Sequence, residues 1–112
     1  MQFSPHVDPR EIARVADLER SIDPRTVLSD RRATNVFDRL AAVPNVQPPA
    51  LLLCGDADML TPAKYSQFLA AHLPRSRARV IAGHGHMLVF ERPDLVDAEV
   101  AAFTRELTNE PA

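Results

Sequence analysis

The feature that most restricts the fold is an apolar run, Ala-Leu-Leu-Leu-Cys at 50–54, followed by a short loop that contains carboxylates. The run shows no alternation of polar and apolar residues, which is typical of a strand buried on both faces of a parallel sheet. A segment with helical periodicity follows at 61–74, and a second short strand is expected at 79–82. A strand, a helix and a strand in this order form a right-handed unit with parallel strands. The sequence therefore predicts an α/β fold.

Two chemically distinctive residues follow the ends of these strands. Asp58 lies in the loop after the first strand, and His86 lies in the loop after the second. The carboxyl ends of parallel strands open onto the same edge of a sheet, which is where open α/β sheets bind ligands. We therefore expect Asp58 and His86 to be neighbours. An aspartate beside a histidine, in this chain order, is typical of the acid and the base of a hydrolase triad.

Helix starts can be recognised on both sides of this unit. Two Asp-Pro pairs, at Asp8 and at Asp23, each predict a helix start, because aspartate caps the free N–H groups and proline suits the first turn. Thr61-Pro62 predicts the start of the helix between the strands, and Pro93 predicts the start of the last helix. The tail at 108–112 is polar and is expected to fray.

Composition and charge argue against several classes of function. The chain has 112 residues, enough for one small domain, and its net charge of −2 gives no basic face for nucleic acid. No apolar stretch approaches the roughly 20 residues needed to span a bilayer, and the first five residues do not resemble a secretory signal. The single cysteine, Cys54, lies in the apolar strand and is expected to be a core residue. We therefore expect a cytoplasmic protein without nucleic-acid or membrane partners.

Two parallel strands cannot cover a segment as apolar as Leu-Leu-Leu at 51–53. A lone parallel pair is also a weak sheet. The sequence therefore predicts one end of a larger sheet, with an edge that is prone to self-association or that accepts a complementing chain.

The ordered motifs resemble the C-terminal part of the α/β-hydrolase superfamily. The family pattern is a strand, Gly-x-x-Asp-x-x-x-Pro, a helix, a strand, Gly-His, Glu-x-Pro and a closing helix; here the motifs begin at Gly55, Gly85 and Glu91. The resemblance covers residues 34–107. It implies a partial α/β-hydrolase fold with two parallel C-terminal strands, flanking helices and a remnant of the helical lid at 1–33.

The same resemblance implies that Asp58 is the triad acid and that His86 is the general base of an esterase-like serine hydrolase. Such an enzyme hydrolyses a small ester through an acyl-enzyme and needs no cofactor or metal. The family's Gly-x-Ser-x-Gly elbow, which carries the nucleophile, does not occur in this sequence. The chain alone is therefore expected to be inactive.

Other interpretations stay open. The chain could belong to a dehalogenase or an epoxide hydrolase of the same fold, or it could be a non-catalytic remnant or a subunit that docks on another chain. Asp56 competes with Asp58 as the acid, although we expect it to turn the chain. His84 and His86, with either aspartate, could form a metal site. We favour that interpretation less than the triad.

Overall fold

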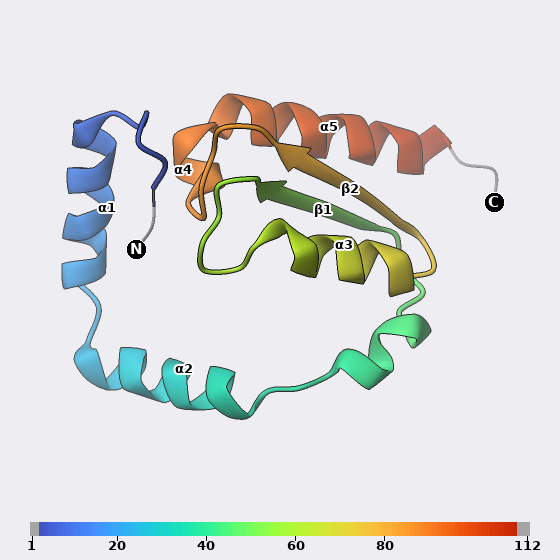
Figure 1. Ribbon diagram of the computed structural model, residues 1–112, viewed down its shortest axis with the longest axis horizontal. Helices are drawn as coiled ribbons and strands as arrows, with labels where there is room; N and C mark the ends of the chain where they lie inside the picture. Colours follow the sequence, from blue (N-terminus) through green and yellow to red (C-terminus); the bar gives the residue numbers. More distant parts are fainter. Residues whose placement is uncertain (1–2, 110–112) are drawn as a thin grey trace.

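The computed structural model describes residues 3–109 of the chain (Figure 1). In chain order, the elements are α1 (Pro9–Arg20), α2 (Pro24–Val36), the 3-10 helix η1 (Leu40–Asn45), β1 (Ala50–Gly55), α3 (Ala63–His72), β2 (Ser76–Ile81), α4 (Leu88–Glu91) and α5 (Pro93–Asn109). Residues 110–112 of the tail that is expected to fray lie outside the described residues. The first two residues of the N-terminal segment lie outside them as well. No helix in the described part of the chain combines the length and the apolar character needed to cross a bilayer.

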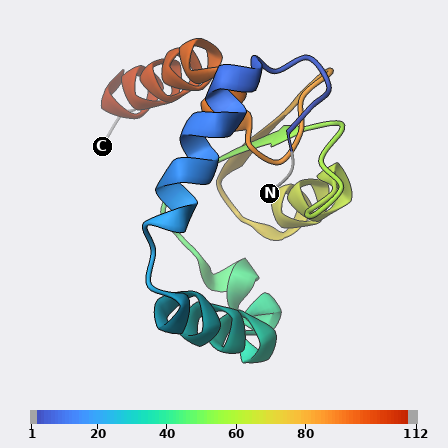
Figure 2. The same cartoon turned by 90° about the vertical axis from the view of Figure 1, so that its left-hand side faces the viewer.

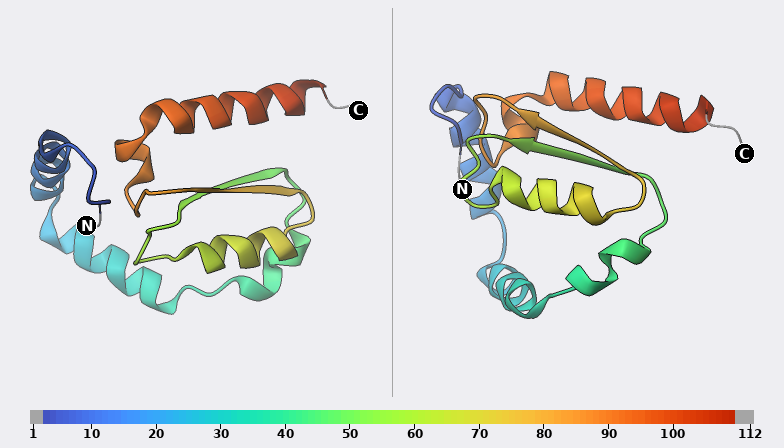
Figure 3. Two further views of the ribbon diagram at one scale, coloured as in Figure 1. Left: turned by 45° about the horizontal axis from the view of Figure 1, so that its top comes forward. Right: turned by 45° about the vertical axis from the view of Figure 1, so that its right-hand side comes forward.

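The strands β1 and β2 form a parallel pair in which Ala50 is opposite Ser76 and Gly55 is opposite Ile81. The helix α3 connects them and packs against both, so the predicted strand, helix and strand unit is confirmed. In Figures 1 and 3, α5 lies along the other side of the strand pair from α3. This arrangement brings the loops after both strands to one end of the sheet.

The second strand begins earlier than predicted, at Ser76, and it ends at Ile81. Arg77, a polar residue, concealed the start of the strand in the sequence, whereas Arg79 stands where the strand is predicted to begin. Both project from the strand toward α5, where Arg77 pairs with Glu106 at 2.5 Å and Arg79 pairs with Glu99. The two ion pairs let a polar sequence form a strand beside a helix.

The helices α1 and α2 form an N-terminal arm, which is connected to β1 through η1. Figure 2 shows α1 standing across the end of the molecule and α2 lying away from the sheet. The helices start where the two Asp-Pro pairs predict, since Asp8 caps α1 and Asp23 caps α2. No residue of α2 is buried.

The buried apolar core of the described residues is small. It consists of Val15, Cys54, Ile81 and Leu88. The leucines at 51–53 are only partly buried, as expected for an apolar strand that needs more cover than this chain supplies. Two strands and their helices are too few to cover these leucines.

We expect the isolated chain to self-associate for two reasons. The partly covered leucines of β1 expose apolar surface, and the two-stranded sheet has free edges. Light scattering after size-exclusion chromatography should show a mass that rises with protein concentration. The thermal midpoint should depend on concentration as well. A monomer that unfolds cooperatively at the same temperature across a wide concentration range would contradict this expectation.

Candidate active site

The loops that follow β1 and β2 are joined by hydrogen bonds between their backbones. The N–H of Asp56 donates to the carbonyl of Ile81 at 3.0 Å, and the N–H of Ala57 donates to the carbonyl of His84 at 2.9 Å. The carboxylate of Asp56 accepts from the N–H of Gly83 at 2.8 Å. Asp56 therefore connects the two loops, as the sequence predicted for a residue that turns the chain.

The close approach of these loops requires glycine at two positions. A Cβ atom on Gly55 would lie 2.1 Å from the carbonyl oxygen of His84, a separation that real Cβ atoms do not show. Gly83 has a φ of 79°, in the left-handed region that glycine adopts without steric cost. Both glycines are therefore needed to place the His84 backbone against the end of β1.

The side chains of Asp58 and His86 meet at this end of the sheet. Nδ1 of His86 lies 3.0 Å from Oδ2 of Asp58. The aspartate side chain is 6% exposed, whereas the histidine side chain is 36% exposed. The proximity expected from the sequence is thus present, with the carboxylate buried and the imidazole reachable from solvent.

Four hydrogen bonds surround the Asp58 carboxylate. Oδ1 accepts from the backbone N–H of Leu60 at 3.0 Å and of Thr61 at 2.8 Å, and Oδ2 accepts from the Thr61 hydroxyl at 3.1 Å as well as facing His86. Burial alone would raise the pKa of Asp58, but the bonds from Thr61, His86 and Leu60 outweigh it and hold that pKa below its usual value. The carboxylate is therefore charged at neutral pH.

The prediction that Thr61-Pro62 caps the following helix is wrong in one respect. The helix α3 begins at Ala63, and Pro62 occupies the cap position without a side-chain bond. The Thr61 hydroxyl is directed instead to Asp58, and it also lies 3.2 Å from Nδ1 of His86. Sequence analysis missed this contact, although a hydroxyl residue shortly after a loop aspartate often closes such a turn.

A second histidine and carboxylate pair supports the loop that carries His86. Nδ1 of His84 lies 3.1 Å from Oε1 of Glu91, whose side chain is only 1% exposed, and Oε2 accepts from the backbone N–H of Ser4 at 3.0 Å. Burial alone would raise the pKa of Glu91, but hydrogen bonds from Ser4, His84 and Gly85 hold it below its usual value. Glu91 thus anchors the loop.

His84 and His86 engage different carboxylates and do not converge on one point. Within residues 3–109, no group of three or more His, Cys, Asp or Glu side chains is arranged to hold a metal ion. The metal site considered from the sequence is therefore not assembled by the described residues.

Cys54 lies near the end of β1 and is buried. Its sulfur is 3.3 Å from the carbonyl oxygen of Gly55 and 3.8 Å from that of Thr61. Burial is the largest of the effects that raise the pKa of this thiol. Cys54 therefore packs as a neutral core residue and is poorly suited to act as a nucleophile.

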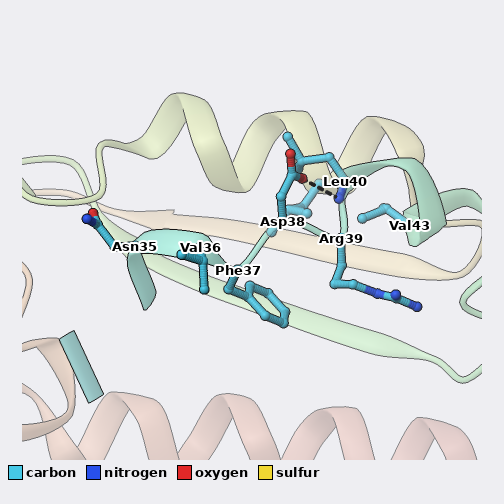
Figure 4. Close-up of a pocket in the computed structure, with 8 residues that line it drawn as sticks. Asn35, Val36, Phe37, Asp38, Arg39, Leu40 and Val43 are labelled. Atoms are coloured by element: carbon cyan, nitrogen blue, oxygen red, sulfur yellow. Dashed lines mark hydrogen bonds between the residues drawn. The ribbon is translucent and has the colours of Figure 1, made fainter. Parts of the chain in front are cut away.

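A hollow of about 480 Å³ lies elsewhere, where α2 meets η1. Figure 4 shows the side chains that line it, and its residues are Asn35, Val36, Phe37, Asp38, Arg39, Leu40, Val43 and Leu69. None of them belongs to the loops that carry Asp58 and His86. The acid and base pair therefore lies outside this hollow.

Comparisons with known proteins identify the family of this chain. The model of the alpha/beta hydrolase family matches residues 3–99. An uncharacterized hydrolase, YugF of Bacillus subtilis, is 35% identical over 57 residues, which cover 51% of this chain and 21% of that protein.

Solved structures of longer hydrolase chains share the arrangement of strands and helices. An esterase from Thermogutta terrifontis matches with 27% identity and a TM-score of 0.57, over 60% of this chain and 25% of that one. The CarC serine hydrolase of carbazole degradation matches in fold with 23% identity and a TM-score of 0.57, over 66% of this chain and 29% of that one. The chain thus spans less than a third of these relatives, and it belongs to the alpha/beta hydrolase family.

Proposed function

We propose that this chain supplies the acid and the base of an ester hydrolase, and that the nucleophile comes from residues outside this sequence. The observation that carries the proposal is the hydrogen bond of 3.0 Å between Oδ2 of Asp58 and Nδ1 of His86. The similarity to a solved esterase supports the choice of an ester as substrate. Asp58 is then the triad acid and His86 the general base.

The geometry suits a proton relay at the second ring nitrogen. A charged Asp58 accepts the Nδ1–H of His86, which leaves a lone pair on Nε2. Nε2 takes the proton of the nucleophile's hydroxyl as its oxygen attacks the ester carbonyl, and then returns that proton to the departing alcohol. Water repeats the sequence on the acyl-enzyme and releases the acid. Asp58 stabilises the imidazolium during both steps and does not itself take up a proton.

The nucleophile is best supplied by further strands that pack beside β1. The leucines at 51–53 are partly covered, and the chain spans 21% to 29% of the hydrolases described above. A longer polypeptide or a separate complementing chain can provide the missing cover and the missing serine together. Either source gives a complete triad at the end of the sheet where Asp58 and His86 lie.

The isolated chain is expected to be catalytically silent. No serine is flanked by the glycines of a nucleophile elbow; the serines are Ser4, Ser21, Ser29, Ser66 and Ser76. Purified chain should neither react with a fluorophosphonate probe nor hydrolyse nitrophenyl esters above the rate in buffer. A complete serine esterase in the same assay provides the positive control. Stoichiometric labelling of any one of these serines would show that the chain contains its own nucleophile.

A further inference from the structure

Thr61 lies between the two residues of the acid and base pair. Its hydroxyl oxygen is 3.1 Å from Oδ2 of Asp58 and 3.2 Å from Nδ1 of His86, while these two atoms are 3.0 Å apart. The three polar atoms therefore form a nearly equilateral triangle. A charged carboxylate can only accept hydrogen bonds, so the Thr61 hydroxyl must donate to Asp58. Its lone pairs then remain available to Nδ1.

The backbone already fixes one oxygen of the carboxylate but leaves the other to side chains. Oδ1 of Asp58 is held by two backbone N–H groups, those of Leu60 and Thr61. Oδ2 accepts from the Thr61 hydroxyl and faces the His86 ring. Without the hydroxyl, the carboxylate can turn about the axis through its anchored oxygen and move Oδ2 away from the imidazole.

We propose that Thr61 is a positioning residue whose hydroxyl holds Oδ2 of Asp58 against Nδ1 of His86 and so fixes the ring in its Nδ1–H tautomer. Nδ1 faces two acceptors, the carboxylate and the lone pairs of the hydroxyl, so a proton on Nδ1 satisfies both. The inference rests on the proposed function, since a base that acts through Nε2 requires this tautomer.

The test uses the whole chain labelled with ¹⁵N in its histidine rings. The ring nitrogen shifts, recorded at about pH 8.5 where an ordinary histidine is neutral, report the tautomer of each ring. The His86 signals are identified by their loss in a His86→Gln variant. Magic-angle-spinning spectra give the same shifts if the sample self-associates. Thr61 is exposed, so Thr61→Val should keep the fold while removing only the hydroxyl; circular dichroism checks this.

The wild-type ring and that of Thr61→Ser should be predominantly the Nδ1–H tautomer. In Thr61→Val, the ratio of the Nε2–H to the Nδ1–H form should rise about fivefold, as expected when the neutral Nδ1–H loses the hydroxyl as an acceptor. Asp58→Asn serves as the comparison, because an amide can donate to Nδ1 and should reverse the preference.

Two negative results have different meanings. If Asp58→Asn changes the tautomer and Thr61→Val does not, the role of Thr61 is wrong while the acid and base pair stands. If neither variant changes the His86 ring, Asp58 does not direct its protonation, and the proposed function fails with the inference. Failure of Thr61→Ser to restore the wild-type ratio would also contradict a role for the hydroxyl.

Discussion

Replacing His86 by alanine is expected to reduce ester turnover by about 10⁴-fold or more in a complete hydrolase that contains this chain. The substitution removes the proposed general base, whose Nδ1 lies 3.0 Å from Oδ2 of Asp58. The histidine side chain is partly exposed, so the fold should survive its loss. The measurement is the turnover of a short-chain nitrophenyl ester, with circular dichroism to confirm folding.

Asp58→Asn should lower turnover by a similar factor, about 10⁴-fold, for a different reason. Asparagine keeps the shape of the side chain but can donate to Nδ1, which favours the tautomer that cannot act as a base. The buried position of Asp58 makes this effect hard for solvent to relieve. His6→Ala is the matched control, because that histidine is exposed and belongs to neither of the two loops.

His84 provides the decisive comparison. His84→Ala should lower stability, since it removes a partner from the buried Glu91 carboxylate, yet turnover per folded molecule should change little. If His84→Ala abolished turnover while His86→Ala retained it, the general base would be misassigned. If both variants lost activity together with bound zinc, a metal site would replace the triad.

Gly55→Ala is expected to destabilise the chain by about 3 kcal/mol or more, at the upper end of the cost of overpacking. The added Cβ would lie 2.1 Å from the carbonyl oxygen and 2.5 Å from the carbonyl carbon of His84. Both atoms belong to the backbone, so no side chain can turn aside to make room. The clash should also displace the loop that carries His86. Urea unfolding followed by circular dichroism measures the loss.

Gly83→Ala is the matched control for this substitution. A Cβ at Gly83 would meet nothing within 4 Å, so the cost there comes only from its positive φ. That cost is about 1 to 2 kcal/mol. A Gly83→Ala variant that is less stable than Gly55→Ala would show that the approach of the two strand ends is not as tight as described.

The course of the chain near the site could be predicted from sequence because it depends on strong local patterns. The apolar run at 50–54, the helical periodicity after it and the second strand together fix a parallel pair, and this pairing brings Asp58 and His86 to one edge. What could not be predicted depends on partners distant in sequence. Arg77 occupies a strand because Glu106 receives it, and no pattern local to β2 indicates that contact.

The details of the site were harder to predict than its location. The orientation of the Thr61 hydroxyl depends on how the loop after β1 closes around Asp58, and helix capping was an equally reasonable use for it. The partial burial of β1 has a physical reason. The apolar pattern of a strand indicates how much burial the strand needs. Its actual exposure depends on which neighbouring segments are present to cover it.

The hydrogen bond from Ser4 to Glu91 joins residues 87 positions apart in sequence. Because this bond fixes one end of the arm and β1 fixes the other, the arm is attached to the rest of the molecule at both of its ends. Lengthening a segment tethered in this way costs little entropy, about 0.6 kcal/mol for each doubling of a flexible loop. Evolution can therefore exchange or extend α1 and α2 without rebuilding the loops that hold His86.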